Sequence, residues 1–298
     1  MKKSRVVLTM SLLCALLQPW ALRAADDDDD EAMLDTQIEL YSRKITANPK
    51  DTKSLMARGM AYNDNGEYGE AVNDFIQVCQ LEPKNFQAFL LCGEALSSAE
   101  DYDMAILTYS QAIQLNAKSA DAYVGRADAR AANGEYQLAV DDYSCAIKLK
   151  NSIDYVRARG WAYVQLEKYL DAIADFNEVV QKVGDEDGGV CYCERGEARL
   201  GAGWLEEALA DLDKGLSLAV QATGLPEHEV ADNCHFLRAK VYIAQKDYKK
   251  ALAAFNVAIK QNGNLHEYYA ERAKAYAALG QPAQAKKDEA QAKSMKRK

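Results

Sequence analysis

The chain has 298 residues, of which 49% are hydrophobic and 27% are charged, and its formal net charge at pH 7 is −9. Nearly half of the chain is available for a buried core, which excludes a wholly disordered or linker-like protein. The acidic balance also argues against nucleic-acid binding, because neutralising phosphates requires clustered Lys and Arg.

The first 24 residues are expected to be a cleavable signal peptide. Lys2, Lys3 and Arg5 form a basic start, residues 6–17 are apolar, and small residues near Ala24 suit cleavage. The apolar stretch is shorter than the roughly 20 residues that span a bilayer, so no stable membrane span is expected after cleavage; an uncleaved anchor is the alternative. The lysine pair and the short length are typical of bacteria, which predicts an exported protein in the periplasm.

Residues 25–34 are predicted to be a disordered acidic N-terminus of the cleaved chain. Six consecutive acids run from Asp26 to Glu31. Such a block repels itself and favours a solvated tail.

From about residue 52 onward the sequence repeats itself. Residues 57–75 (ARGMAYNDNGEYGEAVNDF) and 158–176 (ARGWAYVQLEKYLDAIADF) share an Arg-Gly, an Ala-Tyr, a second Tyr, an Ala and an Asp-Phe in the same register. The small residue after the Arg marks seven copies, spaced 33–36 residues apart except for one spacing of 43. The markers are Gly59, Gly93, Ala127, Gly160, Gly196, Ala239 and Ala273.

Each copy has the pattern of two amphipathic helices. An Ala lies twelve residues after every marker, and an aromatic residue lies sixteen residues after five of them. Small and apolar residues at this spacing form one face of a helix, and polar turns such as residues 65–67 separate the two faces. One helix pair cannot bury both of its faces, so neighbouring pairs must stack.

The period, the turn and the repeated residues resemble the tetratricopeptide repeat over residues 52 to about 293. The resemblance implies an all-α fold, a right-handed α-solenoid of stacked antiparallel helix pairs over residues 35–298. It has about seven motifs and an N-terminal half repeat, roughly residues 35–50, that caps the start. The fifth copy departs most from the pattern, and extra residues around Thr223 to Pro226 predict a looser stack there. The expected repeats lie near residues 52–85, 86–119, 120–152, 153–188, 189–231, 232–265 and 266–298.

One further pair of residues recurs with the marker. An Arg precedes the marker in six copies, and an Asp lies fifteen residues after it in five. The second copy has Cys92 and Thr108 and lacks both partners, whereas the sixth has Arg238 with Ala254. Because the acid occurs with the base, an interhelical ion pair is favoured over a row of arginines that binds an anionic polymer. The predicted pairs are Arg58–Asp74, Arg126–Asp142, Arg159–Asp175, Arg195–Asp211 and Arg272–Asp288.

The sequence contains no catalytic or metal-ligand constellation that we can identify. His228, His235 and His266 are widely separated, and none has metal-ligand spacing with Cys or carboxylates. The chain has no G-x-S-x-G, no phosphate-binding glycine loop and no H-E-x-x-H motif. We therefore expect a protein that is not an enzyme and has no cofactor and no metal.

Cys79 and Cys92 are a candidate disulfide. Exported proteins can form disulfides, and the six cysteines outside the signal peptide permit fifteen connectivities. Cys79 lies on a predicted second helix and Cys92 on the next first helix, so the two are placed to face each other across a repeat junction. Buried free thiols are the expectation for the rest: Cys145, Cys191, Cys193 and Cys234.

In proteins that resemble this repeat, the first helices line a concave groove that holds peptides. The family's clamp for C-terminal carboxylates is absent here, because its basic and amide positions hold other residues, among them Asp121 and Gly125. Trp161 lies at a groove position, where an indole is a candidate hot spot; packing within the stack is the alternative. The predicted partner-binding residues are Met56, Met60, Glu94, Asp128, Arg157, Trp161 and Glu197.

These features predict a non-catalytic scaffold that binds a peptide or helical segment of a partner protein in the groove. The acidic and apolar groove positions suit a basic or amphipathic segment. The alternative is a self-associating structural or assembly subunit of a cell-envelope or secretion complex, which concentration-dependent self-association would reveal.

Overall fold

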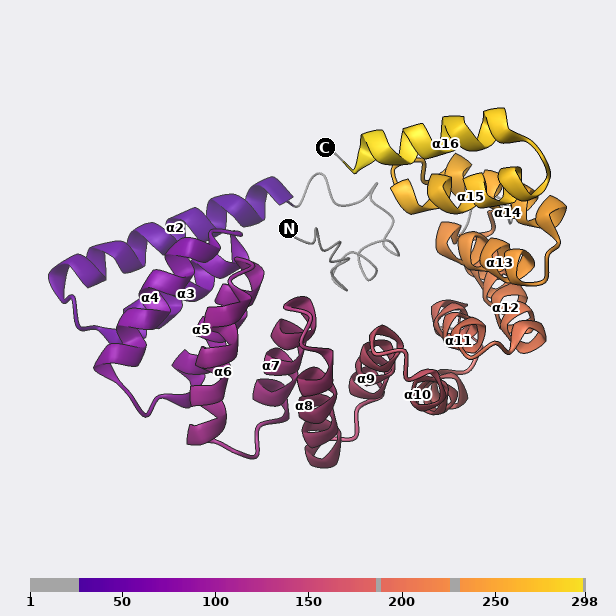
Figure 1. Cartoon of the computed structure of the whole chain (residues 1–298). Coiled ribbons are helices and arrows are strands. Elements are labelled where there is room, and N and C mark those ends of the chain that lie inside the picture. The colour runs from indigo at the N-terminus through magenta and orange to yellow at the C-terminus, as the bar shows by residue number, and fades with distance from the viewer. Residues whose placement is uncertain (1–26, 186–188, 226–230, 297–298) are drawn as a thin grey trace. The chain divides into compact units, whose positions relative to one another are not determined.

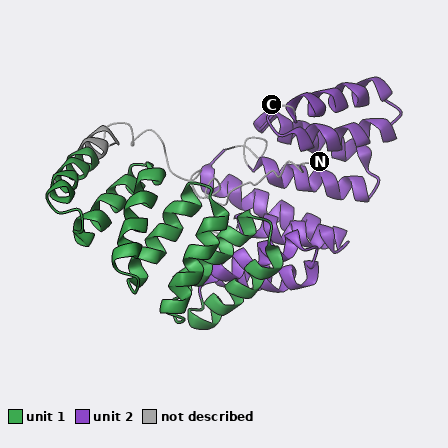
Figure 2. Ribbon diagram, turned by 60° about the vertical axis from the view of Figure 1, so that its left-hand side comes forward, with its two compact units in different colours: residues 1–151 green, residues 152–298 purple. Residues whose placement is uncertain are grey.

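The computed structural model describes residues 27–185, 189–225 and 231–296, and in these residues the chain forms fifteen α-helices and no strand (Figure 1). The predicted signal peptide lies outside the described residues. Within each of two compact units, consecutive helices pack against one another as stacked pairs, and the fold is an all-α solenoid. The chain divides into two compact units, residues 1–151 and 152–298 (Figure 2).

From residue 27 onward, where the structure describes it, unit 1 consists of one single helix and three helix pairs. The single helix is α2 (Asp27–Ala47), which packs against α3. The pairs are α3 (Thr52–Asp64) with α4 (Tyr68–Leu81), α5 (Phe86–Ser98) with α6 (Tyr102–Leu115), and α7 (Ala120–Ala132) with α8 (Tyr136–Leu149).

The described residues of unit 2 form four helix pairs. They are α9 (Ile153–Gln165) with α10 (Tyr169–Val183), α11 (Gly189–Gly201) with α12 (Leu205–Thr223), α13 (Asp232–Ala244) with α14 (Tyr248–Gln261), and α15 (His266–Ala278) with α16 (Pro282–Met295).

Helix α2 overlaps the stretch of residues 25–34 for which the sequence predicts a disordered tail. The helix begins at Asp27, so the acidic stretch from that residue onward is helical.

The turns inside the pairs use a left-handed backbone. Gly66 and Gly134 have φ values of 77° and 78°, which glycine adopts without steric cost. The equivalent turns in other copies hold Glu100, Glu167 and Lys246 at φ values of 61°, 57° and 62°. Because residues with a Cβ disfavour this region, the packing of the two helices must impose the turn where glycine is absent.

The core of each pair forms around the repeated small and aromatic residues. Phe75 and Phe176 are each 1% exposed. A Cβ added to Gly59 would lie 2.7 Å from the ring of Phe75, so the small marker residue allows the two helices to approach closely. The alanines twelve residues after the markers are all buried: Ala71, Ala105, Ala139, Ala172, Ala208, Ala251 and Ala285.

The 43-residue spacing has a local explanation in α12. This helix has 19 residues, whereas α4, α6, α8, α14 and α16 have 14 each. It ends at Thr223, and Gly224, with φ 67°, caps the helix in the left-handed conformation. The extra residues therefore extend a second helix before the chain continues to α13.

Candidate functional site

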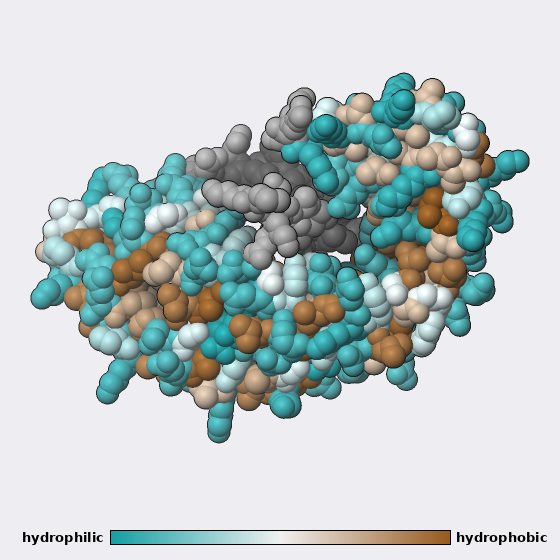
Figure 3. Space-filling view, viewed as in Figure 1, coloured by the Kyte–Doolittle hydropathy of each residue, from teal (hydrophilic) through white to brown (hydrophobic). Residues whose placement is uncertain are grey.

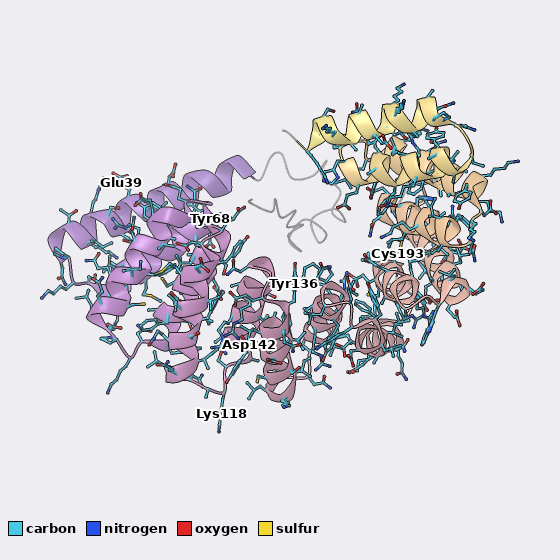
Figure 4. All side chains as sticks on the ribbon, in the orientation of Figure 1. Glu39, Tyr68, Lys118, Tyr136, Asp142 and Cys193 are labelled. Atoms are coloured by element: carbon cyan, nitrogen blue, oxygen red, sulfur yellow. A yellow bond between two sulfur atoms is a disulfide. The ribbon has the colours of Figure 1, made fainter. Side chains whose placement is uncertain are left out.

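Five repeats contain an Arg–Asp ion pair between their two helices. In Arg58–Asp74, Nε lies 2.8 Å from Oδ2 and Nη2 lies 2.7 Å from Oδ1. The five Asp side chains are only 5–8% exposed, and Asp142 on α8 is labelled in Figure 4. Two parallel N–H contacts to one carboxylate are the strong form of a charge-assisted hydrogen bond. The pairs are Arg58–Asp74, Arg126–Asp142, Arg159–Asp175, Arg195–Asp211 and Arg272–Asp288.

Arg58, Arg126, Arg195 and Arg272 also bind the preceding helix of the stack, which is the single helix α2 for Arg58 and the second helix of the preceding pair for the other three. Their Nη1 atoms donate hydrogen bonds of 2.7–3.0 Å. Each arginine therefore joins three helices, and the ion pairs contribute to stacking as well as to pairing. The acceptors are Ser42 for Arg58, Ser110 for Arg126, Asn177 for Arg195 and Asn256 for Arg272.

In the second and sixth copies, too, the arginine and its polar partners are present or absent together. In the sixth copy, Arg238 Nη1 donates to Asp213 Oδ1 on α12 at 3.1 Å, so its carboxylate comes from the preceding pair. In the second copy, Cys92 and Thr108 replace the Arg and the Asp, and Ile76 stands at the preceding-helix position. All three polar groups are therefore missing together at that junction. Sequence reasoning missed the third position, although Ser, Asn or Asp recurs there seventeen residues after the marker.

Two copies carry a second arginine on the same carboxylate. Arg130 binds Asp142 and Arg199 binds Asp211, with N–O distances of 2.5 Å and 2.7 Å. Both arginines occupy the place that Tyr62, Tyr163 and Tyr276 hold in other copies, where the tyrosine ring lies 5.6–6.0 Å from the guanidinium of the repeat arginine. A cation–π contact and a second ion pair are thus alternatives at one position.

The positions three residues before and one residue after each marker form what we call the first-helix face. In unit 1 this face includes Met56 and Met60 on α3, Glu94 on α5 and Asp128 on α7, and Met60 is 47% exposed. Asp128 accepts a hydrogen bond from the buried Tyr143 hydroxyl at 2.5 Å. Burial raises the pKa of Asp128 to about 6, and the hydrogen bond from Tyr143 partly opposes this. By its accessible surface, however, Asp128 as a whole residue is exposed on this face.

In unit 2 the first-helix face includes Arg157 and Trp161 on α9 and Glu197 on α11, all half-buried. Arg157 binds Glu194 across the two helices, with Nε–Oε2 at 2.7 Å and Nη2–Oε1 at 2.8 Å. Burial raises the pKa of Glu194 and of Glu197. Glu194 was not predicted from the sequence, because it lies one position beyond the row that contains Arg157; an acid one repeat after an arginine was the available signal.

The disulfide prediction is corrected. Cys79 and Cys92 are free thiols, and a disulfide joins Cys193 on α11 to Cys234 on α13, with a Cα–Cα distance of 5.7 Å. The expectation of free thiols at Cys193 and Cys234 is therefore wrong. The inserted residues between α12 and α13 hid the proximity of these cysteines, which are 41 residues apart in the sequence. Cys193 is labelled in Figure 4.

The surface in Figure 3 is mixed: small apolar patches lie among hydrophilic residues. On the second helices of unit 1, Met104, Leu107 and Leu138 are 44%, 61% and 45% exposed. Within the described part of the chain, no helix is both long and apolar enough to cross a membrane.

Comparison with solved structures gives the fold. A tetratricopeptide repeat protein from Parabacteroides merdae superimposes with a TM-score of 0.69 and 19% identity, covering 82% of this chain and 93% of its own. A chain of the APC/C hetero-tetramer Cut9-Hcn1 superimposes with a TM-score of 0.62 and 16% identity. The match covers 87% of this chain but only 49% of the Cut9-Hcn1 chain. YrrB, described as a TPR protein with an unusual peptide-binding site, superimposes with a TM-score of 0.50 and 19% identity. The match covers 63% of this chain and 92% of YrrB.

Family models give the membership. The model described as TPR repeat matches residues 59–99, and models described as tetratricopeptide repeat match residues 90–152 and 233–265. No curated protein sequence is similar enough to this chain to be matched. With the repeated helix pairs and their shared core residues, these matches show that the chain is a tetratricopeptide repeat protein.

Proposed function

We propose that the protein is a non-catalytic scaffold whose first-helix face binds a peptide or a helical segment of a partner protein. The observation that carries this proposal is that different positions of the repeat have different roles. The repeated Arg, Asp, Ala and aromatic residues build the stack, whereas the first-helix face changes chemistry from copy to copy. Residues that vary on an otherwise repeated framework are suited to recognition rather than to packing.

The residues for this role are Trp161 with Arg157 and Glu197 in unit 2, and Met56, Met60, Glu94 and Asp128 in unit 1. A half-buried indole offers a large contact area with one polar group, which is the character of an interface hot spot. The acidic residues of the first-helix face, Glu94 and Asp128 in unit 1 and Glu197 in unit 2, favour a basic or amphipathic segment through charge complementarity. YrrB, which shares the fold, is described as having a peptide-binding site.

The test is selection of peptides from a displayed random library on the purified full-length protein. Trp161→Ala should lose the selected peptides, with circular dichroism confirming equal helix content. Trp204→Ala is the matched control, because Trp204 is 42% exposed and lies in the turn between α11 and α12, off the first-helix face. Selected peptides that bind the protein and both variants equally would place binding elsewhere.

The second candidate is self-association as a structural or assembly subunit. It is favoured by the exposed Met104, Leu107 and Leu138 on the second helices of unit 1. Sedimentation of the wild-type protein and a Leu107→Glu variant over a range of concentrations tests it. A wild-type dimer that dissociates in the variant supports this candidate, and monomers throughout contradict it.

We also propose export to a bacterial periplasm after cleavage near Ala24. The basic, apolar and small-residue pattern of residues 1–24 supports this, as does the Cys193–Cys234 disulfide, since disulfides persist in oxidising compartments. N-terminal sequencing of protein from fractionated cells should find residue 25 at the start of the periplasmic form. A chain that starts at Met1 in the cytoplasmic fraction would contradict export.

A further inference from the structure

The Arg157–Glu194 ion pair fixes how two neighbouring first helices meet. These residues lie on α9 and α11, which are equivalent helices of adjacent repeats and run in the same direction. The pair is partly shielded, with 27% and 21% of the two side chains exposed. Because the ion pair aligns Arg157 on α9 with Glu194 on α11, residues one turn further along each helix also lie opposite each other.

Trp161 and Glu197 lie one turn beyond this ion pair. Trp161 follows Arg157 by four residues on α9, and Glu197 follows Glu194 by three residues on α11. At these spacings, the side chains of Trp161 and Glu197 project from the same helix faces as Arg157 and Glu194. The indole and the carboxylate therefore border the same space on the first-helix face of unit 2.

The charge of Glu197 is not paired within this space. Among the described residues, none forms a hydrogen bond or an ion pair with Glu197, whereas the neighbouring Glu194 is bound by Arg157. The cation that most influences Glu197 is Lys240, and its ammonium lies 5.5 Å from the centre of the Phe236 ring. Glu194 and Glu267 add negative potential. A cation that binds beside this half-buried carboxylate would therefore stabilise its charged form.

We propose that Trp161 and Glu197 form a slot for one Lys or Arg side chain of the bound partner segment. This inference rests on the proposed function and adds the chemistry of its ligand. The carboxylate of Glu197 accepts hydrogen bonds from the cationic group, and the indole of Trp161 covers its alkyl stem or its planar face. A metal ion does not fit as well, because the described residues offer no group of three or more His, Cys, Asp or Glu side chains that could hold one.

The experiment extends the peptide selection to three glutamate variants. Peptides selected on the wild-type protein should share a Lys or Arg at a fixed position. Binding of one such peptide, measured by fluorescence polarisation, should weaken about tenfold in Glu197→Gln. It should weaken by a similar factor when the peptide's Lys or Arg is replaced by norleucine or citrulline. Glu206→Gln, an exposed glutamate on α12, is the matched control and should bind as the wild type does.

Charge reversal makes the test independent of folding losses. Selection on Glu197→Lys should enrich peptides with Asp or Glu at the position where the wild type selects a base. Peptides that depend on Trp161 but tolerate Glu197→Gln, or that share no basic position, would overturn the cation slot and leave the proposed function standing. If no selected peptide depends on Trp161, the proposed function fails and the cation slot fails with it.

Discussion

The guanidinium of Arg159 and the carboxylate of Asp175 form a two-pronged contact between α9 and α10, with Nε–Oδ2 at 2.9 Å and Nη2–Oδ1 at 2.8 Å. Asp175 is almost completely shielded, with 8% of its side chain exposed, and Arg159 is 21% exposed. Burial raises the pKa of Asp175 and the arginine opposes that rise, so each partner is needed to offset the desolvation of the other.

Removing one member of this pair should be costly. We expect Arg159→Ala and Asp175→Ala each to lower the free energy of unfolding by about 3 kcal/mol, because each leaves a shielded charge uncompensated. The double variant should lose less than the sum, which urea titrations in a double-mutant cycle would measure. Additive losses would contradict coupling between the two side chains. The exposed pair Lys182–Glu178, at 45% and 41% exposure, is the control, with an expected effect of about 0–0.5 kcal/mol.

Loss of the Cys193–Cys234 disulfide should destabilise unit 2. A covalent link across 41 residues restricts the unfolded chain, and for such a loop the expected contribution is roughly 2–4 kcal/mol. The double variant Cys193→Ser with Cys234→Ser should therefore unfold at lower urea. A reducing agent should have the same effect on the wild type and none on the variant, whereas Cys145→Ser, a free thiol, should leave sensitivity to the reducing agent unchanged.

Gly125→Ala should destabilise unit 1. A Cβ at Gly125 would lie 2.4 Å from the ring of Tyr109, which is 2% exposed and also contacts the position of Gly93. The ring is confined on both sides, so we expect a loss of about 1–3 kcal/mol from overpacking. Gly69→Ala on α4 is the control, since nothing lies within 4 Å of an added Cβ there. It should raise stability by about 0.5–1 kcal/mol through helix propensity; equal effects of the two substitutions would contradict this packing argument.

Asp128 should give stability a specific pH dependence. Burial raises its pKa to about 6, above the ordinary value of 3.8, so the folded protein retains this proton over an interval in which the unfolded chain releases it. The contribution of Asp128 is therefore fully present below pH 3.8 and is lost as the pH rises through about 6.

Relative to the wild type, Asp128→Asn should become more stable as the pH rises through this interval. Urea midpoints across the interval would measure the difference, with Asp141→Asn, an exposed aspartate on α8, as the control. NMR of the side-chain carboxyl groups should assign a titration midpoint of about 6 to Asp128. A midpoint near 3.8 would show that solvent reaches the carboxylate fully.

The sequence contained most of the information needed for the fold. Three kinds of core residue recur at fixed intervals: the marker residue, the buried alanines such as Ala71 and the aromatics such as Phe75. They recur because the two helices of every repeat pack through the same contacts. The recurrence of Arg with Asp likewise reflected a local contact, between the two helices of one repeat.

The third partner of each arginine was harder to recognise, because Ser, Asn and Asp alternate at that position and share only the ability to accept a hydrogen bond.

By itself, the sequence determined the repeat, the pairing of helices and the residues that build the core, since these depend on contacts within a few tens of residues. Only the tertiary structure decided which side chains from different repeats meet. The bond between Cys193 and Cys234, the free thiols of Cys79 and Cys92, and the contact of Arg157 with Glu194 all belong to this class. The insertion after α12 changes the spacing along the chain, and contacts between repeats depend on how the stacked helices are placed in space rather than on the period of the sequence.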